Sequence, residues 1–416
     1  MHIRPAEFLR TLVRRMFEAT VFFIPILVLP WTVSPLEINK QALFYACATI
    51  GILAWLGQAL FTKTVEISFS KIWIPLLVFV SLAAISAGLS PDVYTSMFGQ
   101  GNQEYTSIVT IVLGLGFACV GAQILDVPMV RRLLALGVLS SAIVGFFGVF
   151  PFFGASLGTL PTNFIGTPNA LAVYLLVMAL VGSSMIMLGQ FDSPRQRLVV
   201  HVSTGITILA TLGVLFAIDY VVLWVLAILG CVVLFGLALL HPSMFTQPIR
   251  CILPMALLVS GLFFSVLPSV VTSPFPAEVS LSTRSSWDIA TSVFENGGWA
   301  FGTGPGTYAV NFAQYHSADL NGTAFWDTQF DRASSAFMTM LPTFGLPATI
   351  AWIISLALLA GFACFAYRRA QHPHDLPVLV GWIVLALAWF CYPQNFALMA
   401  MYWIFTAFAL RIVSGR

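Results

Sequence analysis

The chain has 416 residues, of which 59% are hydrophobic and only 8% are charged, and its mean hydropathy is +0.94. Soluble domains carry about 25% charged residues, so this composition excludes an ordinary soluble protein and predicts an all-α integral membrane protein. The formal net charge of +2 is too small to indicate a nucleic-acid partner.

The residues before the first apolar run have two contrasting faces. Apolar side chains share one helical face (Phe8, Leu9, Leu12, Val13 and Met16), and Arg10, Arg14 and Arg15 lie opposite. This pattern indicates a helix in the inner membrane interface, with a plain basic flank as the alternative. No small-residue cleavage site follows, so we expect no cleaved signal here.

Long apolar runs predict about twelve transmembrane helices, because an α-helix needs about 20 residues to cross a bilayer. The predicted spans lie near 18–36, 41–62, 72–90, 105–125, 132–153, 168–190, 198–217, 220–240, 250–272, 346–366, 375–392 and 395–412. They belong to a single polytopic domain, 1–416, and contain all six cysteines. Charged residues are almost absent from the spans, which weighs against an ion-driven transporter.

Lysine and arginine are distributed unevenly between the two sets of connections. Of the 18 basic residues, fifteen fall in one set, and only Lys40, Arg284 and Arg332 fall in the other. Since cytoplasmic connections are the more basic, both termini are predicted to be cytoplasmic. The expected outer segments are 34–40, 91–104, 154–167, 273–334 and 393–394.

The outer segment 273–334 is the one large polar stretch of the chain. Ten aromatic residues lie between Trp287 and Phe330, so we expect an ordered cap rather than a disordered loop. Residues 286–295 are predicted to form a short helix that ends at "ENGG". After the loop, 335–345 is expected to be a short surface or re-entrant helix, because Pro342 and Pro347 interrupt the apolar stretch.

The sequence "GTGPG", which includes Gly304 and Gly306, is a weak motif. It lacks the lysine and hydroxyl residue of a phosphate-binding Walker loop. A plain turn is the simpler interpretation. The glycines would alternatively let the backbone approach a ligand or the adjacent helices closely.

Arg284 and Arg332 open and close the aromatic part of this loop, against the charge bias of the outer side. The arginine fork suits phosphate oxygens, and lipid-linked diphosphates offer them on this side. Pairing with a loop carboxylate is the alternative. A base near an acceptor hydroxyl would come from His316, Asp327 or Asp331, and none of the three has a strong claim.

Four segments together resemble the O-antigen ligase and polymerase superfamily. They are "TRSSWDIATSVFENGGWAFGTGPGTY" (283–308), "SSAFMTMLPTFGLPATIAWI" (334–353), "FIGTPNALAVYLLV" (164–177) and "MFGQGNQEYTSIVTI" (97–111). Arg284 and Trp287 match the family's arginine and nearby tryptophan, and Gly304 and Gly306 lie in its glycine-rich turn. Asn169 matches the asparagine of its Gly-x-x-Asn start of a span.

The resemblance implies a fold like that of C-type glycosyltransferases, in the bacterial inner membrane. It implies transfer of a glycan from undecaprenyl diphosphate to a lipid, glycan or protein acceptor at the outer face, without metal or other cofactor. Arg284 would neutralise the leaving diphosphate. The chain departs from the family in three places. The family histidine would fall near Ser334 or Ser335, 218–220 reads "Ile-Asp-Tyr" instead of "Ser-Arg-Gly", and "GQGNQEY" lacks an arginine.

These departures leave two other functions open: binding or transport of lipid-linked glycans, and a non-catalytic role in envelope polysaccharide assembly. A ligase needs an arginine and a base outside, whereas a transporter needs polar groups deep in the spans. The sequence meets the first condition in part and favours the enzyme.

Overall fold

The computed structural model describes residues 5–32, 36–63, 72–99, 104–153, 162–245, 247–267, 278–323, 325–370 and 374–415. Every regular element among them is a helix, which confirms the predicted all-α class. Parts of several predicted segments lie outside the described residues: 33–35, 100–103, 154–161, 268–277 and position 324. The same holds for three of the counted charges, Arg4, Lys71 and Arg416.

Seven helices in the described part of the chain are long and apolar enough to cross a membrane. They are α2 (Glu37–Thr62), α6 (Val127–Gly148), α7 (Pro168–Leu188), α8 (Pro194–Ile218), α9 (Val221–Ala238), α14 (Leu346–Arg369) and α16 (Phe396–Val413). Four further apolar helices are 13 to 17 residues long: α3 (Trp73–Gly88), α5 (Ile108–Ile124), α10 (Ile252–Phe264) and α15 (Leu376–Cys391). The chain is therefore a multi-pass helical membrane protein, and twelve crossings remain a prediction.

The first predicted span, 18–36, does not form one helix. Helix α1 (Pro5–Phe23) ends earlier, and residues 24–32 form turns. Pro25 has no backbone N–H and cannot continue the helix. The apolar face of α1 packs into the bundle, where Phe17 is fully buried and stacks on Phe117 of α5 with ring centroids 3.9 Å apart.

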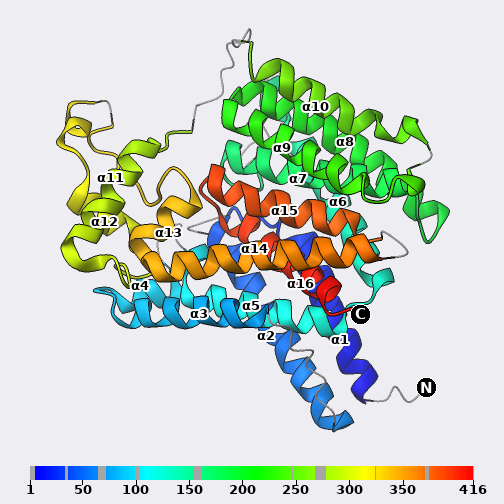
Figure 1. The fold of residues 1–416 in the computed structure, drawn as a ribbon, viewed down its shortest axis with the longest axis horizontal. Helices are drawn as coiled ribbons and strands as arrows, with labels where there is room; N and C mark the ends of the chain where they lie inside the picture. Colours follow the sequence, from blue (N-terminus) through cyan, green and yellow to red (C-terminus); the bar gives the residue numbers. More distant parts are fainter. Residues whose placement is uncertain are drawn as a thin grey trace.

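Helices α7 and α16 form the centre of the bundle, because nearly every side chain of both is buried. Helices that are apolar all round are the ones that other helices surround. Figure 1 shows α14 and α15 running across the view, with α3 and α5 below them and α8 to α10 above. The start of α1 and the end of α16 lie toward the right of this view. The helices of the loop predicted to lie outside, called the outer loop from here on, lie at the left.

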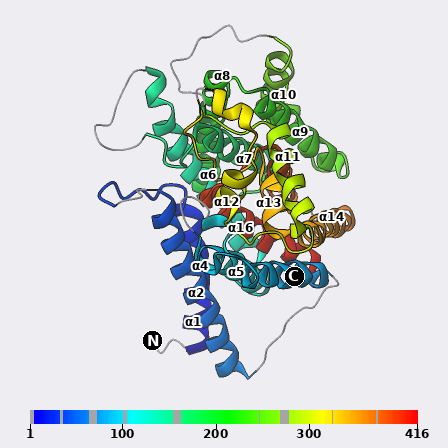
Figure 2. The same ribbon diagram turned by 90° about the vertical axis from the view of Figure 1, so that its left-hand side faces the viewer.

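The outer loop carries two helices, α11 (Thr283–Val293) and α12 (Tyr308–Tyr315), followed by α13 (Ala336–Phe344). Figure 2 looks onto this end of the molecule. Leu281, Ile289, Tyr308, Phe312, Phe330 and Ala333 form a small apolar core of the loop's own. The predicted helix in 286–295 is present as α11. The predicted glycine in the left-handed region is Gly297, with φ of +90°.

The predicted interruption after the loop is also confirmed. Helix α13 ends at Phe344 and α14 begins at Leu346, with Gly345 alone between them. Gly345 has φ of +82°, a conformation that favours glycine. Pro347 then lies in the first turn of α14, where its missing N–H leaves no helical bond unmade.

Candidate functional site

Arg284 and Trp287 lie on the exposed side of α11. The buried side of this helix is formed by Ser286, Ile289 and Ala290 together with Val293. Arg284 makes no side-chain hydrogen bond or ion pair with any described residue, and Trp287 keeps 49% of its surface exposed. Both residues are therefore at the rim of the loop, not in its interior.

His316 and Asp327 belong to the part of the loop beyond α11. His316 follows α12, where its Nδ1 lies 2.8 Å from the carbonyl oxygen of Phe312 and its ring stacks on the Phe312 ring. Asp327 is exposed. His316 is thus held by the loop's own apolar core.

The glycine-rich turn packs against the α13–α14 junction. The N–H of Thr303 donates to the carbonyl of Pro342 (3.0 Å), and that of Gly304 donates to the carbonyl of Thr343 (2.9 Å). Gly304 and Gly306 both have positive φ, +106° and +76°. The described contacts therefore show that these glycines let the backbone approach the adjacent helices closely. This is one of the two uses expected for them.

Arg332 is paired with its neighbour Asp331. Its Nε and one terminal nitrogen donate to the two carboxylate oxygens at 2.8 and 3.0 Å, and its other terminal nitrogen donates to the carbonyl of Gln394 at 3.3 Å. The carboxylate pairing that the sequence left as an alternative is thus present. These three bonds use three of the five guanidinium N–H groups.

The guanidinium of Arg332 is also close to an aromatic ring, 5.9 Å from the ring centre of Tyr105. Burial lowers the pKa of Arg332, but the hydrogen bond and charge of Asp331 outweigh burial and raise it above its ordinary value. Arg332 is therefore a fixed and only partly exposed positive charge, with 16% of its side-chain surface accessible.

A second carboxylate, Glu278, lies at the start of α7. It accepts the backbone N–H of Asn169 at 3.3 Å and the hydroxyl of Tyr392 at 2.7 Å. The Tyr392 oxygen is also 2.5 Å from the hydroxyl of Thr167, the N-cap of α7. Burial, followed by the charge of Glu278, raises the pKa of Tyr392 well above its ordinary value. The side-chain oxygen of Asn169 is buried and has no hydrogen-bond partner among the described residues.

The connection 392–395 joins this group to Arg332. Gln394, whose carbonyl accepts from Arg332, is fully buried, and neither polar atom of its side chain has a described partner. Asn395 caps α16 and also donates to the carbonyl of Ile165. The connection is therefore packed between the outer loop and the start of α7.

A matching arrangement holds the start of α16. Glu37 accepts the N–H of Phe396 at 2.9 Å. Lys40 is fully buried and donates to the carbonyls of Phe164 and Ile165. Two helix N-termini thus meet here, each with a carboxylate on a first-turn amide, the favourable sign for a helix dipole.

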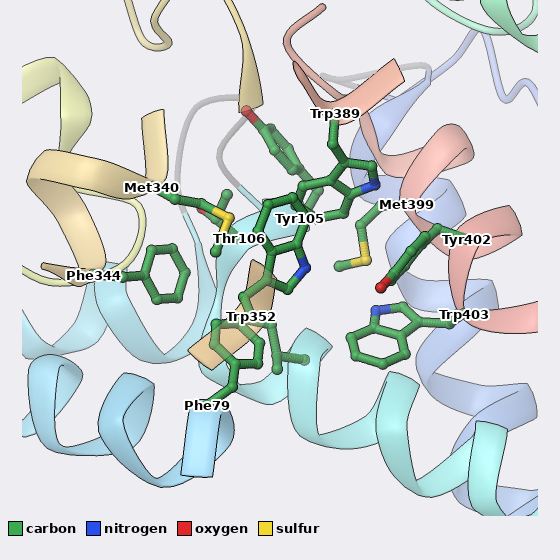
Figure 3. A pocket seen from close by; sticks show the side chains of 11 residues that line it. Phe79, Tyr105, Thr106, Met340, Phe344, Trp352, Trp389, Met399, Tyr402 and Trp403 are labelled. Carbon is green, nitrogen blue, oxygen red and sulfur yellow. The ribbon is translucent and has the colours of Figure 1, made fainter. Parts of the chain in front are cut away.

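A small aromatic cavity, of about 20 Å³, lies beside this polar group. Its lining includes Tyr105, Trp352, Trp389, Met399, Tyr402 and Trp403 (Figure 3). Tyr105 belongs to both regions, because it lines the cavity and lies under the Arg332 guanidinium. The indole N–H groups of Trp389 and Trp403 are buried without a described acceptor. Arg284 is not among the lining residues.

The structure therefore brings together two of the predicted site regions, Arg332 with Asp331 and the α7 start at Asn169. Sequence reasoning missed Glu278, Tyr392 and Gln394. The available signal was "YPQN", an unusually polar link between the last two apolar runs. Such a group, with a partly buried cation, unpaired polar atoms and aromatic side chains beside them, can bind an anionic head group.

No protein-family model and no curated protein matches this chain.

Proposed function

We propose that this protein transfers a glycan from undecaprenyl diphosphate to a lipid, glycan or protein acceptor at the outer face of the inner membrane. Twelve membrane crossings, cytoplasmic termini and a C-type-glycosyltransferase-like fold are parts of the same proposal. The observation that supports it best is the position of Arg332. Its partly buried charge lies between the polar residues of 392–395 and a small aromatic cavity.

This position suits a lipid diphosphate. Two N–H groups of the Arg332 guanidinium remain beyond the three bonds it makes, and phosphate oxygens accept such pairs with good geometry. The Tyr105 ring would lie against the first apolar part of the carrier.

The chemistry places negative charge on the diphosphate as the bond to the sugar breaks. A fixed cation in a site with few waters stabilises that charge before the reaction begins. We assign this role first to Arg332. Arg284, on the exposed side of α11, would contact the donor from the rim, where water screens its charge.

The test is reconstitution of the purified protein in liposomes with an undecaprenyl diphosphate glycan and a panel of lipid, glycan and peptide acceptors. Formation of a glycosylated acceptor in the absence of nucleotide and metal supports the proposal. Tight donor binding without any product would favour the non-catalytic alternative. Movement of the donor between leaflets would favour transport.

A further inference from the structure

The proposed reaction needs a base, and the bases expected from the sequence are poorly placed. His316 is held against Phe312 within the loop core. Asp327 is exposed, and both carboxylate oxygens of Asp331 accept from the Arg332 guanidinium, a positive charge that competes with a proton for them. None of these three residues therefore presents its carboxylate or imidazole to an acceptor hydroxyl beside Arg332.

Glu278 is differently placed. It is half-buried, and its two described hydrogen bonds, from Tyr392 and Asn169, fall on different carboxylate oxygens. An ionised carboxylate has about four acceptor positions, so each oxygen retains one for an incoming hydroxyl. The two bonds hold the group in one orientation.

Tyr392, which donates a hydrogen bond to Glu278, connects Glu278 to Arg332. The backbone carbonyl of Tyr392 accepts the N–H of Ala336, at the start of α13, at 3.2 Å. This is next to Ser334 and Ser335, the positions where the family resemblance would put a histidine. The Tyr392 hydroxyl interacts electrostatically with both Glu278 and Arg332. Its pKa is raised by burial, so the phenol itself is a poor base near neutral pH.

We infer that Glu278 is the general base of the transfer, an inference that rests on the proposed function. The carboxylate of Glu278 takes the proton of the acceptor hydroxyl while that oxygen bonds to the anomeric carbon of the donor sugar. The bond from this carbon to the diphosphate breaks, and its electron pair leaves with the diphosphate, opposite Arg332. Tyr392 and Asn169 hold the carboxylate in place.

The main experiment compares wild type with Glu278→Gln, which keeps the shape and an acceptor oxygen but cannot take the proton. General-base catalysis contributes about 10²- to 10⁴-fold, so transfer should fall at least a hundred-fold while donor binding changes less than about two-fold. Glu295→Gln, the same change at an exposed loop position, is the matched control and should keep the wild-type rate.

The pH profile separates catalysis from a structural role at the start of α7. The groups described around Glu278 are Tyr392 and Tyr220, both with pKa raised by burial, and Arg332 through Tyr392. The acid limb of kcat/KM should therefore disappear in Glu278→Gln and persist in Asp331→Asn. Formate should restore part of the rate to Glu278→Ala, because a small carboxylate can occupy the vacated space.

Two outcomes would overturn the assignment: Glu278→Gln transferring within about three-fold of wild type, or losing activity with its acid limb unchanged. If Glu278→Gln does not fold, formate rescue of Glu278→Ala decides, and absence of rescue counts against Glu278. A wild-type protein that transfers nothing would instead sink the proposed function itself. The two failures are thus distinguishable.

Discussion

Gly302 and Gly345 pack backbone against backbone. A Cβ atom at Gly302 would lie 2.7 Å from the amide nitrogen of Gly345, and one at Gly345 would lie 2.8 Å from that of Gly302. Both residues have positive φ, +66° and +82°. Glycine is therefore required at both positions for two reasons: the positive φ, and the lack of space for a Cβ atom.

Gly302→Ala and Gly345→Ala should each destabilise the protein by about 2 kcal/mol or more, because left-handed strain adds to overpacking. Thermal unfolding in detergent measures the effect. Gly297→Ala is the matched control, since Gly297 also has positive φ (+90°) but its added Cβ would meet nothing within 4 Å. Equal losses at Gly297 and Gly302 would show that close packing is not the reason for glycine.

Arg332→Ala should weaken donor binding about ten- to a hundred-fold, since a hydrogen bond to a charged group contributes about 1.5–3 kcal/mol. Arg332→Lys should recover only part, because an ammonium cannot reproduce the guanidinium fork. Arg284→Ala should have a smaller effect, because Arg284 is exposed. Binding of a fluorescent lipid diphosphate ranks the variants, and a larger loss at Arg284 would reverse our assignment of the clamp.

Gly114→Ala should disturb the aromatic cavity. A Cβ at Gly114 of α5 would lie 2.6 Å from Cγ of Trp403, so the Trp403 indole must move. We expect donor binding to weaken several-fold, as overpacking shifts side chains from their positions. Gly116→Ala is the control, because its Cβ would meet only the flexible end of Ile52, at 3.0 Å. Unchanged donor binding in Gly114→Ala would show that the donor does not contact the cavity.

Tyr392 should keep its proton well above pH 10. Burial and the charge of Glu278 raise its pKa, so the neutral phenol stabilises the fold below the ordinary tyrosine value of about 10. That contribution is lost progressively as pH rises from this value through the higher, folded one. Ultraviolet titration of wild type and Tyr392→Phe should show no difference in tyrosinate near pH 10. A difference there would contradict the buried Tyr392–Glu278 contact.

Periodicity and composition were enough to predict the helices, because long apolar runs have few other structures in a membrane. The short α11 also followed from local residues, since the "ENGG" stop ends it. A break after the loop was predicted from Pro342 and Pro347, but it falls at Gly345, with Pro342 inside α13 and Pro347 in the first turn of α14. The first span was wrong because the apolar run continues through Pro25, while the helix does not.

The site was harder to predict because it depends on distant contacts. Tyr392 and Glu278 are 114 residues apart, and Asn169 and Glu278 are 109 apart. No local pattern links such positions. Lys40 shows the same limit. In the sequence it is counted as a positive charge of a predicted outer segment, yet its side chain is fully buried among backbone carbonyls.

The four-residue link 392–395 has a consequence for motion. Its carbonyl groups accept hydrogen bonds from the Ala336 amide and the Arg332 guanidinium, and the Asn395 side chain donates to the carbonyl of Ile165. The next amide along the chain, that of Phe396, donates to Glu37. Hydrogen bonds at or next to this short link therefore join the outer loop, α2 and the starts of α7 and α16. The amides of Tyr392, Ala336 and Phe396, which donate to Ala388, Tyr392 and Glu37, should exchange slowly with deuterium, and these segments should move together.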